Sequence, residues 1–440
     1  MLAFLKCLKG HGRHRLAWLA LGTLASTTVP TLKAQAELSV DLRYRATLFA
    51  DYGLYEKNRE GTNSSELEHE FRTDISLSKE RHLLELRLGR RIVDEAEFKR
   101  STDEDVHRIH QAYLDFSLLD SDMLSLRVGR QELSYNRGIL IDGDDWDMEG
   151  NTFDALKFYL DGSTWDLDVL YGQLAKDRHN RIAGINLERT SPIRTINEFY
   201  FWYFGIGDEQ DSLPLRGSPE LEVYNFGTRM EGKLSRPLFY HWMVNCQTGK
   251  MHKTRTKDLQ AYNLVANLDY FVNHSVVRNV GIEYSLSSGD DSKTPGRHET
   301  FIPPFANRHV RSGAMDWMSM MNADMITLYV FADVHPKIEA LLEFHQFYLN
   351  SQDSAWYLAD LSPAWWWGSN DWPGSTDASK DIGSELDLHL KFGKKTNRIF
   401  TAGYSLFFPG KLITNWRDPH WGWGGNDTTQ WAYVQTEFKF

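Results

Sequence analysis

The chain has 440 residues, of which 49 are Lys or Arg and 60 are Asp or Glu, so its formal net charge is −11. This acidic balance argues against nucleic acid as a partner, because a nucleic-acid-binding surface needs an excess of basic side chains. Aromatic residues make up 13% of the chain, which fits girdles of Trp and Tyr at membrane interfaces and also fits a carbohydrate-binding sandwich.

The N-terminus has the pattern of a secretory signal. Four basic residues precede an uncharged run over 16–32: Lys6, Lys9, Arg13 and Arg15. Ala34-Gln35-Ala36 then supplies small residues for signal peptidase, so we predict a signal peptide over residues 1–36. A spanning helix would need roughly 20 apolar residues, and Pro30 interrupts this run. The mature chain, 37–440, would be one domain with Cys246 as its only cysteine and no internal disulfide.

The first predicted strand covers residues 38–50. Leu38, Val40, Leu42, Tyr44, Ala46 and Leu48 alternate there with Ser39, Asp41, Arg43, Arg45 and Thr47. Side chains along a strand point alternately to its two faces, so this strand has one apolar and one charged face. A soluble sandwich would also bury the apolar face, so the number of such strands and the lengths of their connections must decide.

Segments of the same kind follow to the end of the chain. We predict strands at 66–78, 83–93, 111–118, 124–129, 155–160, 165–171, 180–189, 197–206, 222–232, 239–249, 259–271, 276–287, 322–334, 337–349, 381–392, 398–408 and 430–440. Long connections alternate with short ones, as in a barrel whose long loops all lie on one side of a membrane. The fold prediction is therefore all-β: a transmembrane antiparallel β-barrel of about 18 strands, with long extracellular loops and short periplasmic turns.

The last strand carries a signal of its own. Ala432, Val434, Thr436 and Phe438 alternate with polar residues, and the chain stops on Phe440. Such an ending is typical of chains handed to the barrel assembly machinery, although an ordinary closing strand can also end in Phe. We therefore expect the assembly machinery and outer-membrane lipid as partners.

Three blocks of residues are spread over the chain. The first is Arg127-Val128-Gly129-Arg130-Gln131-Glu132-Leu133 with Trp146 in an acidic loop and Phe153-Asp154-Ala155-Leu156-Lys157. The second is Ser288-Gly289-Asp290 with Thr300-Phe301, Phe305, His309, Gly313 and Met315-Asp316. The third is Gly383-Ser384-Glu385-Leu386-Asp387 with Gly403-Tyr404-Ser405 and Phe408-Pro409-Gly410. Together they resemble the bacterial alginate-export family of outer-membrane channels. The resemblance implies an 18-stranded Gram-negative barrel for passive passage, in the direction of export, of an anionic polysaccharide or oligosaccharide such as alginate.

Basic residues are predicted to line the solute path through the aqueous lumen. They are Arg43, Arg45, Arg87, Arg127, Arg130, Lys157 and Arg229. Arg130 has lipid-side parity unless a bulge turns it inward. Rings of Arg or Lys favour anions, and spaced arginines offer successive partners to the carboxylates of a polyuronate. Acids with lumen parity are at least as numerous, so pairing across neighbouring strands is the alternative role of these bases.

An acidic loop follows the first block. Asp142, Asp144 and Asp145, with Asp154 beyond them, are predicted to shape a constriction, and a solvated loop is the alternative. The loop departs from a calcium site because Trp146 stands two residues after Asp144, where an oxygen ligand is needed. We expect no metal and no cofactor.

Tryptophans are the candidate sugar-stacking residues. Trp146, Trp365 and Trp366 are predicted either to stack on sugar rings or to anchor the rim at the lipid interface.

Two other functions stay open. A porin of the same fold would take up small solutes instead of exporting a polymer. An outer-membrane enzyme is the third choice, and we do not expect one because Gly-x-Ser-x-Gly, HExxH and zinc-type histidine spacings are missing from the sequence. We expect a monomer, with periplasmic partners if the traffic is export.

Overall fold

The computed structural model describes residues 35–50, 64–79, 82–95, 106–118, 123–147, 150–191, 195–207, 220–252, 255–291, 293–294, 296–307, 309, 311–359, 361, 363–364, 379–393, 396–415 and 428–440. Within its strands, the side chains of residues 35, 49–50, 64–71, 79, 82, 87–95 and 106–108 are not described. Residues 1–34 of the predicted signal peptide lie outside the described part of the chain.

The described residues form one sheet of eighteen long strands and one very short one. The long strands are β1 (Gln35–Ala50), β2 (Ser64–Lys79), β3 (His82–Glu95), β4 (Val106–Ser117), β5 (Leu124–Gln131), β6 (Phe153–Asp161), β7 (Trp165–Leu174), β8 (Arg181–Thr190), β9 (Ile196–Ile206), β10 (Glu220–Lys233), β11 (Leu238–His252), β12 (Thr256–Phe271), β13 (Val277–Ser287), β15 (Ala323–His335), β16 (Ile338–Leu349), β17 (Asp381–Phe392), β18 (Arg398–Pro409) and β19 (Thr429–Lys439). The short elements are the 3-10 turn η2 (Asn136–Gly138), β14 (Arg297–His298) and α1 (Lys411–Asn415).

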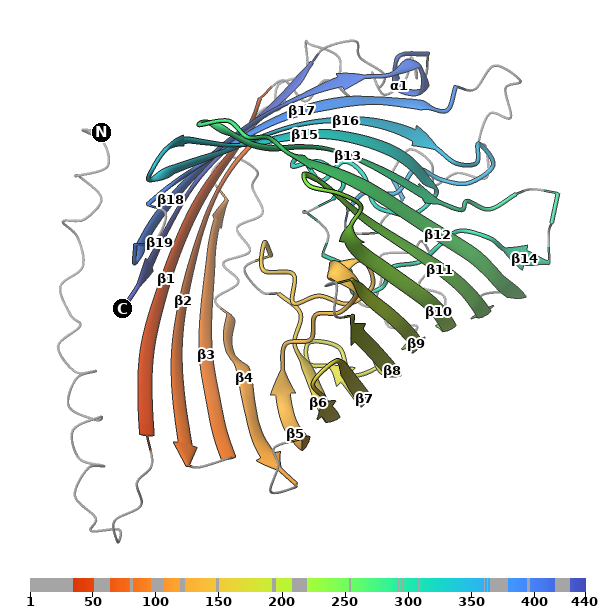
Figure 1. The fold of residues 1–440 in the computed structure, drawn as a ribbon. Coiled ribbons are helices and arrows are strands. Elements are labelled where there is room, and N and C mark those ends of the chain that lie inside the picture. Colours follow the sequence, from red (N-terminus) through yellow and green to blue (C-terminus); the bar gives the residue numbers. More distant parts are fainter. Residues whose placement is uncertain are drawn as a thin grey trace, which may run out of the picture.

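The sheet closes on itself. In Figure 1 the strands follow one another round the wall from β1 to β19, and β19 lies beside β1. β1 pairs antiparallel with β19 from Asp41 opposite Lys439 to Ala50 opposite Gln430. Every neighbouring pair of long strands is antiparallel, and only the two-residue β14 runs parallel to its partner β12. The predicted closed antiparallel barrel of 18 strands is therefore confirmed.

The two faces of the strands differ as the alternation predicted. Leu48, Phe226 and Ile282 are among the large apolar side chains exposed on the outer face. The opposite face carries buried or half-buried polar side chains such as Arg45 and Asn245. The apolar rows therefore point out of the barrel instead of meeting in a sealed interior. No helix in the described ranges is both long enough and apolar enough to cross a membrane.

Strand β4 begins at Val106, five residues before the predicted start. The pairing of β3 with β4 passes from Arg87 opposite Gln111 to Leu88 opposite Ile109, which leaves His110 as an extra residue. A bulge of this kind breaks the two-residue period, so alternation alone could not find the first half of the strand. His110 is buried and its Nε2 lies 2.5 Å from Oε1 of Glu132.

A row of asparagines joins four strands on the inner face. Asn225 donates to Oδ1 of Asn245 over 3.2 Å, Asn245 donates to Oδ1 of Asn263 over 3.0 Å, and Asn263 donates to Oγ of Ser287 over 2.9 Å. The Tyr200 hydroxyl also donates to Asn245 over 2.8 Å. Because these side chains are buried, each bond satisfies a polar group that water does not reach.

The asparagine row predicts the effect of one substitution. Asn245→Val would leave polar groups of Tyr200, Asn225 and Asn263 without a partner and lower the free energy of unfolding by about 1–3 kcal/mol. Denaturant titration of the barrel in lipid vesicles, followed by tryptophan fluorescence, measures this loss. The control is Ile282→Val on the outer face, for which a change within about 0.5 kcal/mol is expected. Equal losses for the two variants would contradict the role of the row.

Candidate functional site in the lumen

The connection between β5 and β6, residues 132–152, folds into the barrel. Its apolar side chains Leu133, Ile139, Leu140 and Ile141 are buried. They belong to a core that also contains Phe301 and Phe305 from the connection between β13 and β15. The backbones of the two connections join as well, because Asp142 donates to the carbonyl oxygen of Phe305 over 2.8 Å. Two connections expected among the long outer loops therefore occupy the lumen.

The 132–152 connection reaches from one side of the lumen to the other. At one end, Asn136 donates to Oε1 of Glu198 on β9 over 3.0 Å and accepts from Nε1 of Trp202 over 2.9 Å. At the other end, Asp145 contacts Arg43 on β1 and Arg72 on β2. Strand order places β9 about half-way round the ring from β1. The loop therefore crosses the lumen, and any solute has to pass beside it.

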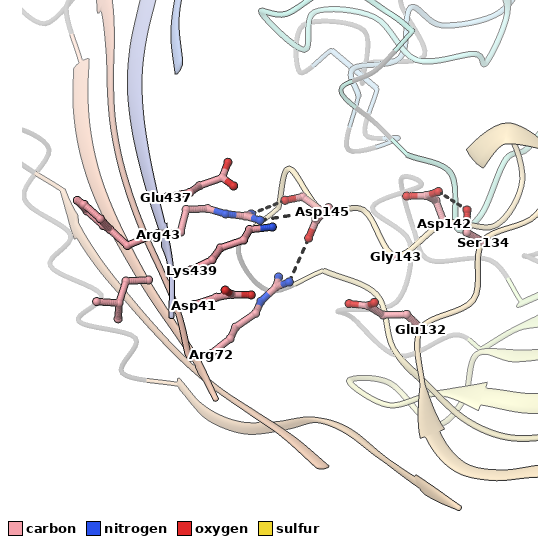
Figure 2. Close-up of a pocket in the computed structure, with 12 residues that line it drawn as sticks. Asp41, Arg43, Arg72, Glu132, Ser134, Asp142, Gly143, Asp145, Glu437 and Lys439 are labelled. Carbon is pink, nitrogen blue, oxygen red and sulfur yellow. Dashed lines mark hydrogen bonds and ion pairs between the residues drawn. The ribbon is translucent and has the colours of Figure 1, made fainter. Parts of the chain in front are cut away.

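Asp145 lies between two arginines of the wall, as Figure 2 shows. Arg43 donates through Nη1 to the Asp145 carbonyl oxygen over 2.6 Å, and its Nη2 lies 3.4 Å from Oδ2. Arg72 donates through Nη1 to Oδ1 over 3.1 Å. The carboxylate stays open to the lumen, because 70% of the Asp145 side chain is exposed.

The two arginines also change the acidity of Asp145. Enclosure within the barrel by itself raises the pKa of a carboxyl group, because burial disfavours the charged form. The positive charges of Arg43 and Arg72 outweigh this effect, so the pKa of Asp145 lies below its usual range. The group is therefore ionised at neutral pH and pairs with the wall as a carboxylate.

Trp146 ties the same end of the loop to its surroundings. Its carbonyl oxygen accepts from Nη1 of Arg45 over 2.7 Å, and the Arg45 guanidinium carbon lies 4.0 Å from the centre of its ring. The His309 ring stacks on Trp146 with 3.7 Å between ring centroids and 2° between planes. The ring predicted to stack on sugars thus packs against side chains of the protein itself.

Two cavities of mixed charge lie in the lumen. The first, of about 420 Å³, lies between the loop and the wall of β1, β2 and β19; its charged lining residues are Arg43, Arg72, Lys439, Asp41, Glu132, Asp142, Asp145 and Glu437 (Figure 2). The second, of about 630 Å³, includes Arg137, Arg278, Arg311, Asp269, Glu283, Glu343, His309, His345 and His389. Acids outnumber bases in the first cavity and match the arginines in the second, in line with the sequence, where acids of lumen parity are at least as numerous as bases.

The other acids of the loop have different positions. Asp142 accepts from the Ser134 hydroxyl over 2.8 Å and from Nδ2 of Asn307 over 3.0 Å, so it joins the two inward connections. Asp144 is buried and has a left-handed backbone, with φ of 52°. Glu149 lies outside the described residues. Asp145 is thus an acid of this loop that reaches the basic wall.

Most other predicted bases pair with acids in the wall. Arg127 donates to Asp115 over 2.6 Å, and Nζ of Lys157 lies 2.7 Å from Asp168. Arg229 is buried and contacts Glu188, Glu198 and Glu231. The side chain of Arg87 and the whole of Trp365 and Trp366 lie outside the described part of the chain.

Arg130 and Asp154 differ from the prediction. Arg130 donates to both oxygens of Asp154, over 2.7 and 3.0 Å. The two residues lie opposite each other on β5 and β6 and share the parity of Val128 and Leu156, which are each 39% exposed on the outer face. The bulge needed to turn Arg130 inward is not present in β5, because its register with β4 and β6 is continuous. This ion pair therefore lies on the outside of the barrel at the loop end, not in the solute path.

Some site residues were not named from the sequence. Lys439 shares the polar face of the last strand with Glu437, so alternation could have placed it in the lumen. Asn136 offered no such signal, because its contact with Glu198 depends on the left-handed backbone of residues 136–138. Loop anchors of this kind depend on the path of the chain through space.

Removing the charge of Asp145 should change ion selectivity. Asp145→Asn leaves the charges of Arg43 and Arg72 less compensated, so the anion-to-cation permeability ratio is expected to rise. The measurement is the reversal potential of single channels in a planar bilayer under a KCl gradient. Asp154→Asn is the matched control, because this carboxylate lies on the outer face and should leave the ratio unchanged. A similar shift in both variants would refute the placement of Asp145 in the ion path.

The lowered pKa of Asp145 predicts how the difference in reversal potential between the wild type and Asp145→Asn depends on pH. A carboxyl group whose pKa is depressed in the folded state keeps its charge, and its ion pairs, until the pH falls below its ordinary value of about 3.9. The difference in reversal potential between the wild type and Asp145→Asn should therefore persist from pH 8 to pH 5 and close only in stronger acid. A difference that closes between pH 7 and pH 5 would be inconsistent with pairing to Arg43 and Arg72.

Comparison with known proteins agrees with this architecture. Three solved structures share the fold: Pseudomonas aeruginosa OccK2 (OpdF) in complex with glucuronate (11% identity, TM-score 0.56, 92% of this chain and 98% of that chain), OprD from Pseudomonas aeruginosa (10%, 0.55, 92% and 93%) and a BenF-like porin from Pseudomonas fluorescens Pf-5 (10%, 0.56, 93% and 98%). No curated protein matches the sequence. The profile of the alginate export family matches residues 34–420. The chain therefore belongs to the alginate export family, and its family and fold are those of outer-membrane channels rather than of enzymes.

Proposed function

We propose that the channel passes an anionic saccharide, such as alginate or its oligomers, through the lumen in the direction of export. The observation that carries this proposal is the Asp145 carboxylate held between Arg43 and Arg72 in a water-exposed cavity. A uronate carboxylate has the same charge and the same two oxygens, and arginine binds such groups well. The cavity thus has the chemistry to receive one sugar carboxylate at a time.

Displacement of Asp145 explains how the solute would enter. The 70% exposed carboxylate of Asp145 can be exchanged for another carboxylate, because the incoming group makes the same ion pairs with Arg43 and Arg72. The exchange keeps the charge around Arg43 and Arg72 unchanged. Arg45, Arg127 and Lys157 would act as further steps in the same way, each exchanging a protein acceptor for a solute oxygen. No energy source is needed for such exchange.

The comparisons support an anionic sugar as the solute. The family is named for alginate export, and the OccK2 structure of the same fold holds glucuronate, a uronate. We further propose cleavage after Ala36, a single barrel domain over 37–440, a monomer in outer-membrane lipid that the barrel assembly machinery inserts, and periplasmic partners that deliver the polymer.

Uptake of small solutes is the second candidate. The observation that favours it is the loop across the lumen, which is joined to the 288–322 connection by a bond from the Asn307 amide to the Gly138 carbonyl over 2.8 Å. The cavities beside it, of about 420 and 630 Å³, have the size of small-molecule sites. A single sugar can occupy one such cavity beside the loop, which suits the uptake of a small solute.

Block of single-channel current separates the two functions. Polyuronate export predicts that uronate oligomers block more strongly than glucuronate monomer, since several carboxylates engage the wall at once. Arg43→Gln with Arg72→Gln should weaken this block at least tenfold, because both partners of the entering carboxylate are lost. Arg130→Gln on the outer face is the control, and uronate oligomers should block its current as strongly as that of the wild type. Equal block by monomer and oligomer would favour the porin, and block unchanged by the double substitution would reject the proposed site.

A further inference from the structure

Two of the family blocks that lie about 70 residues apart in the sequence meet in the lumen. Residues 311–316, here called the strap, are part of the connection between β13 and β15. They contain Gly313, Met315 and Asp316 of the second block and pack against Glu385 and Asp387 of the third. The function proposed above does not use this contact.

Glu385 and Asp387 accept hydrogen bonds from the backbone of the strap. The Met315 amide donates to Oε1 of Glu385 over 2.8 Å, and the Ala314 amide donates to Oδ2 of Asp387 over 3.4 Å. Both acids project from the lumen face of β17 and have no exposed surface. Nε2 of His345, on the neighbouring β16, lies 3.3 Å from the same Oδ2 of Asp387. The pair therefore presents acceptors to two successive amides of the strap.

Gly313 permits this close approach. Its φ is +83°, in the left-handed region that favours glycine, and a Cβ at this position would lie 2.7 Å from Oε2 of Glu385. A Cβ here would force the Glu385 carboxylate and the strap apart, and the left-handed backbone disfavours any residue other than glycine. The glycine and the carboxylate thus depend on each other.

The other end of the strap is attached to a different strand. Nη1 of Arg311 donates to both oxygens of Glu283 on β13, over 2.7 and 2.9 Å. β15 and β16 lie between β13 and β17 in the sheet, so the strap passes along the inside of the wall over two strands. Arg311, Gly313 and Ala314 line the 630 Å³ cavity. Where the strap lies therefore decides how wide the lumen is on this side.

The burial of two neighbouring acids in a barrel wall needs a reason. A buried carboxyl group costs folding free energy, whereas an apolar side chain at the same place would not. The strap amides supply this reason, since they need acceptors once they are packed against β17. We propose that Glu385, with Asp387 beside it, is a positioning residue that holds the strap against the wall and so sets the width of the pore. This role goes beyond the proposed solute, because it applies to any molecule that passes.

The variants follow from the geometry. Glu385→Ala removes the acceptor of the Met315 amide, and Gly313→Ala forces the strap and the carboxylate apart. Glu385→Gln is the conservative rescue, because its amide oxygen can still accept from Met315. Gly296→Ala is the matched glycine control in the same connection, since a Cβ there would meet no atom within 4 Å.

The experiment uses the full-length chain in planar bilayers with KCl, with no saccharide. Single-channel conductance is recorded with polyethylene glycols of increasing mass, which report the largest polymer that enters the pore. Heat-shifted mobility on denaturing gels verifies that each barrel is folded. We expect Glu385→Ala and Gly313→Ala to conduct more and to admit polyethylene glycols of larger mass than the wild type does. Glu385→Gln and Gly296→Ala should behave like the wild type.

Several results would overturn the proposal. The proposal is rejected if Glu385→Ala and Gly313→Ala both have the conductance and the polymer size limit of the wild type. It is also rejected if Glu385→Gln behaves like Glu385→Ala. If Glu385→Ala does not fold, Gly313→Ala alone decides, because it keeps every acid of the wall. Failure here leaves the block by uronates untouched, since that measurement depends on Arg43 and Arg72 of β1 and β2 and not on the bonds of the strap to β13 and β17.

Discussion

The need of every strand for two hydrogen-bonded neighbours dominates this structure. A chain that crosses lipid with strands has to pair every backbone amide, and only a closed ring achieves this without an edge. Here the pairing of β1 with β19 closes the ring. Closure separates an outer apolar face from an enclosed polar one, so any segment that folds inward is confined within a cylinder of charged and amide side chains.

The enclosed face carries acids beside its bases, and this mixture bears on the proposed passage of an anion. Arg127 and Lys157 pair with Asp115 and Asp168, and Arg43 pairs with the carboxylate of a loop. A wall of unpaired arginines would bind a polyanion tightly and release it slowly. A wall that already holds carboxylates exchanges one for another, which suits a path along which a charged chain has to keep moving.

The two inward connections have different attachments. The tip of the 132–152 connection reaches the wall through Asp145, whose carboxylate is open to water. The strap reaches it through buried bonds to Glu385 and Asp387. These contrasting attachments favour a lumen in which the tip of the 132–152 connection can be displaced while the strap is held in place. The three family blocks are thus related in space, because each contributes residues to these inward connections or to their anchors.

Local pattern was enough for the wall. Apolar and polar residues that alternate with a period of two determined which face of each strand meets lipid, the number of strands and most of their bounds, and the parity of Arg43, Arg127 and Lys157. Where a bulge at His110 shifted the period, the start of β4 was missed. Parity also placed Arg130 correctly on the outer face, whereas its place in the motif had led us to expect it in the solute path.

Only the tertiary structure decided what fills the cylinder. Arg43 and Asp145 are 102 positions apart, and Met315 and Glu385 are 70 apart. No local periodicity links such residues, because their contact depends on how long connections turn inward after the ring has closed. The sequence by itself therefore determined a channel wall with charged residues inside, and the folded chain determined which of those charges meet a loop, which pair within the wall and which point to lipid.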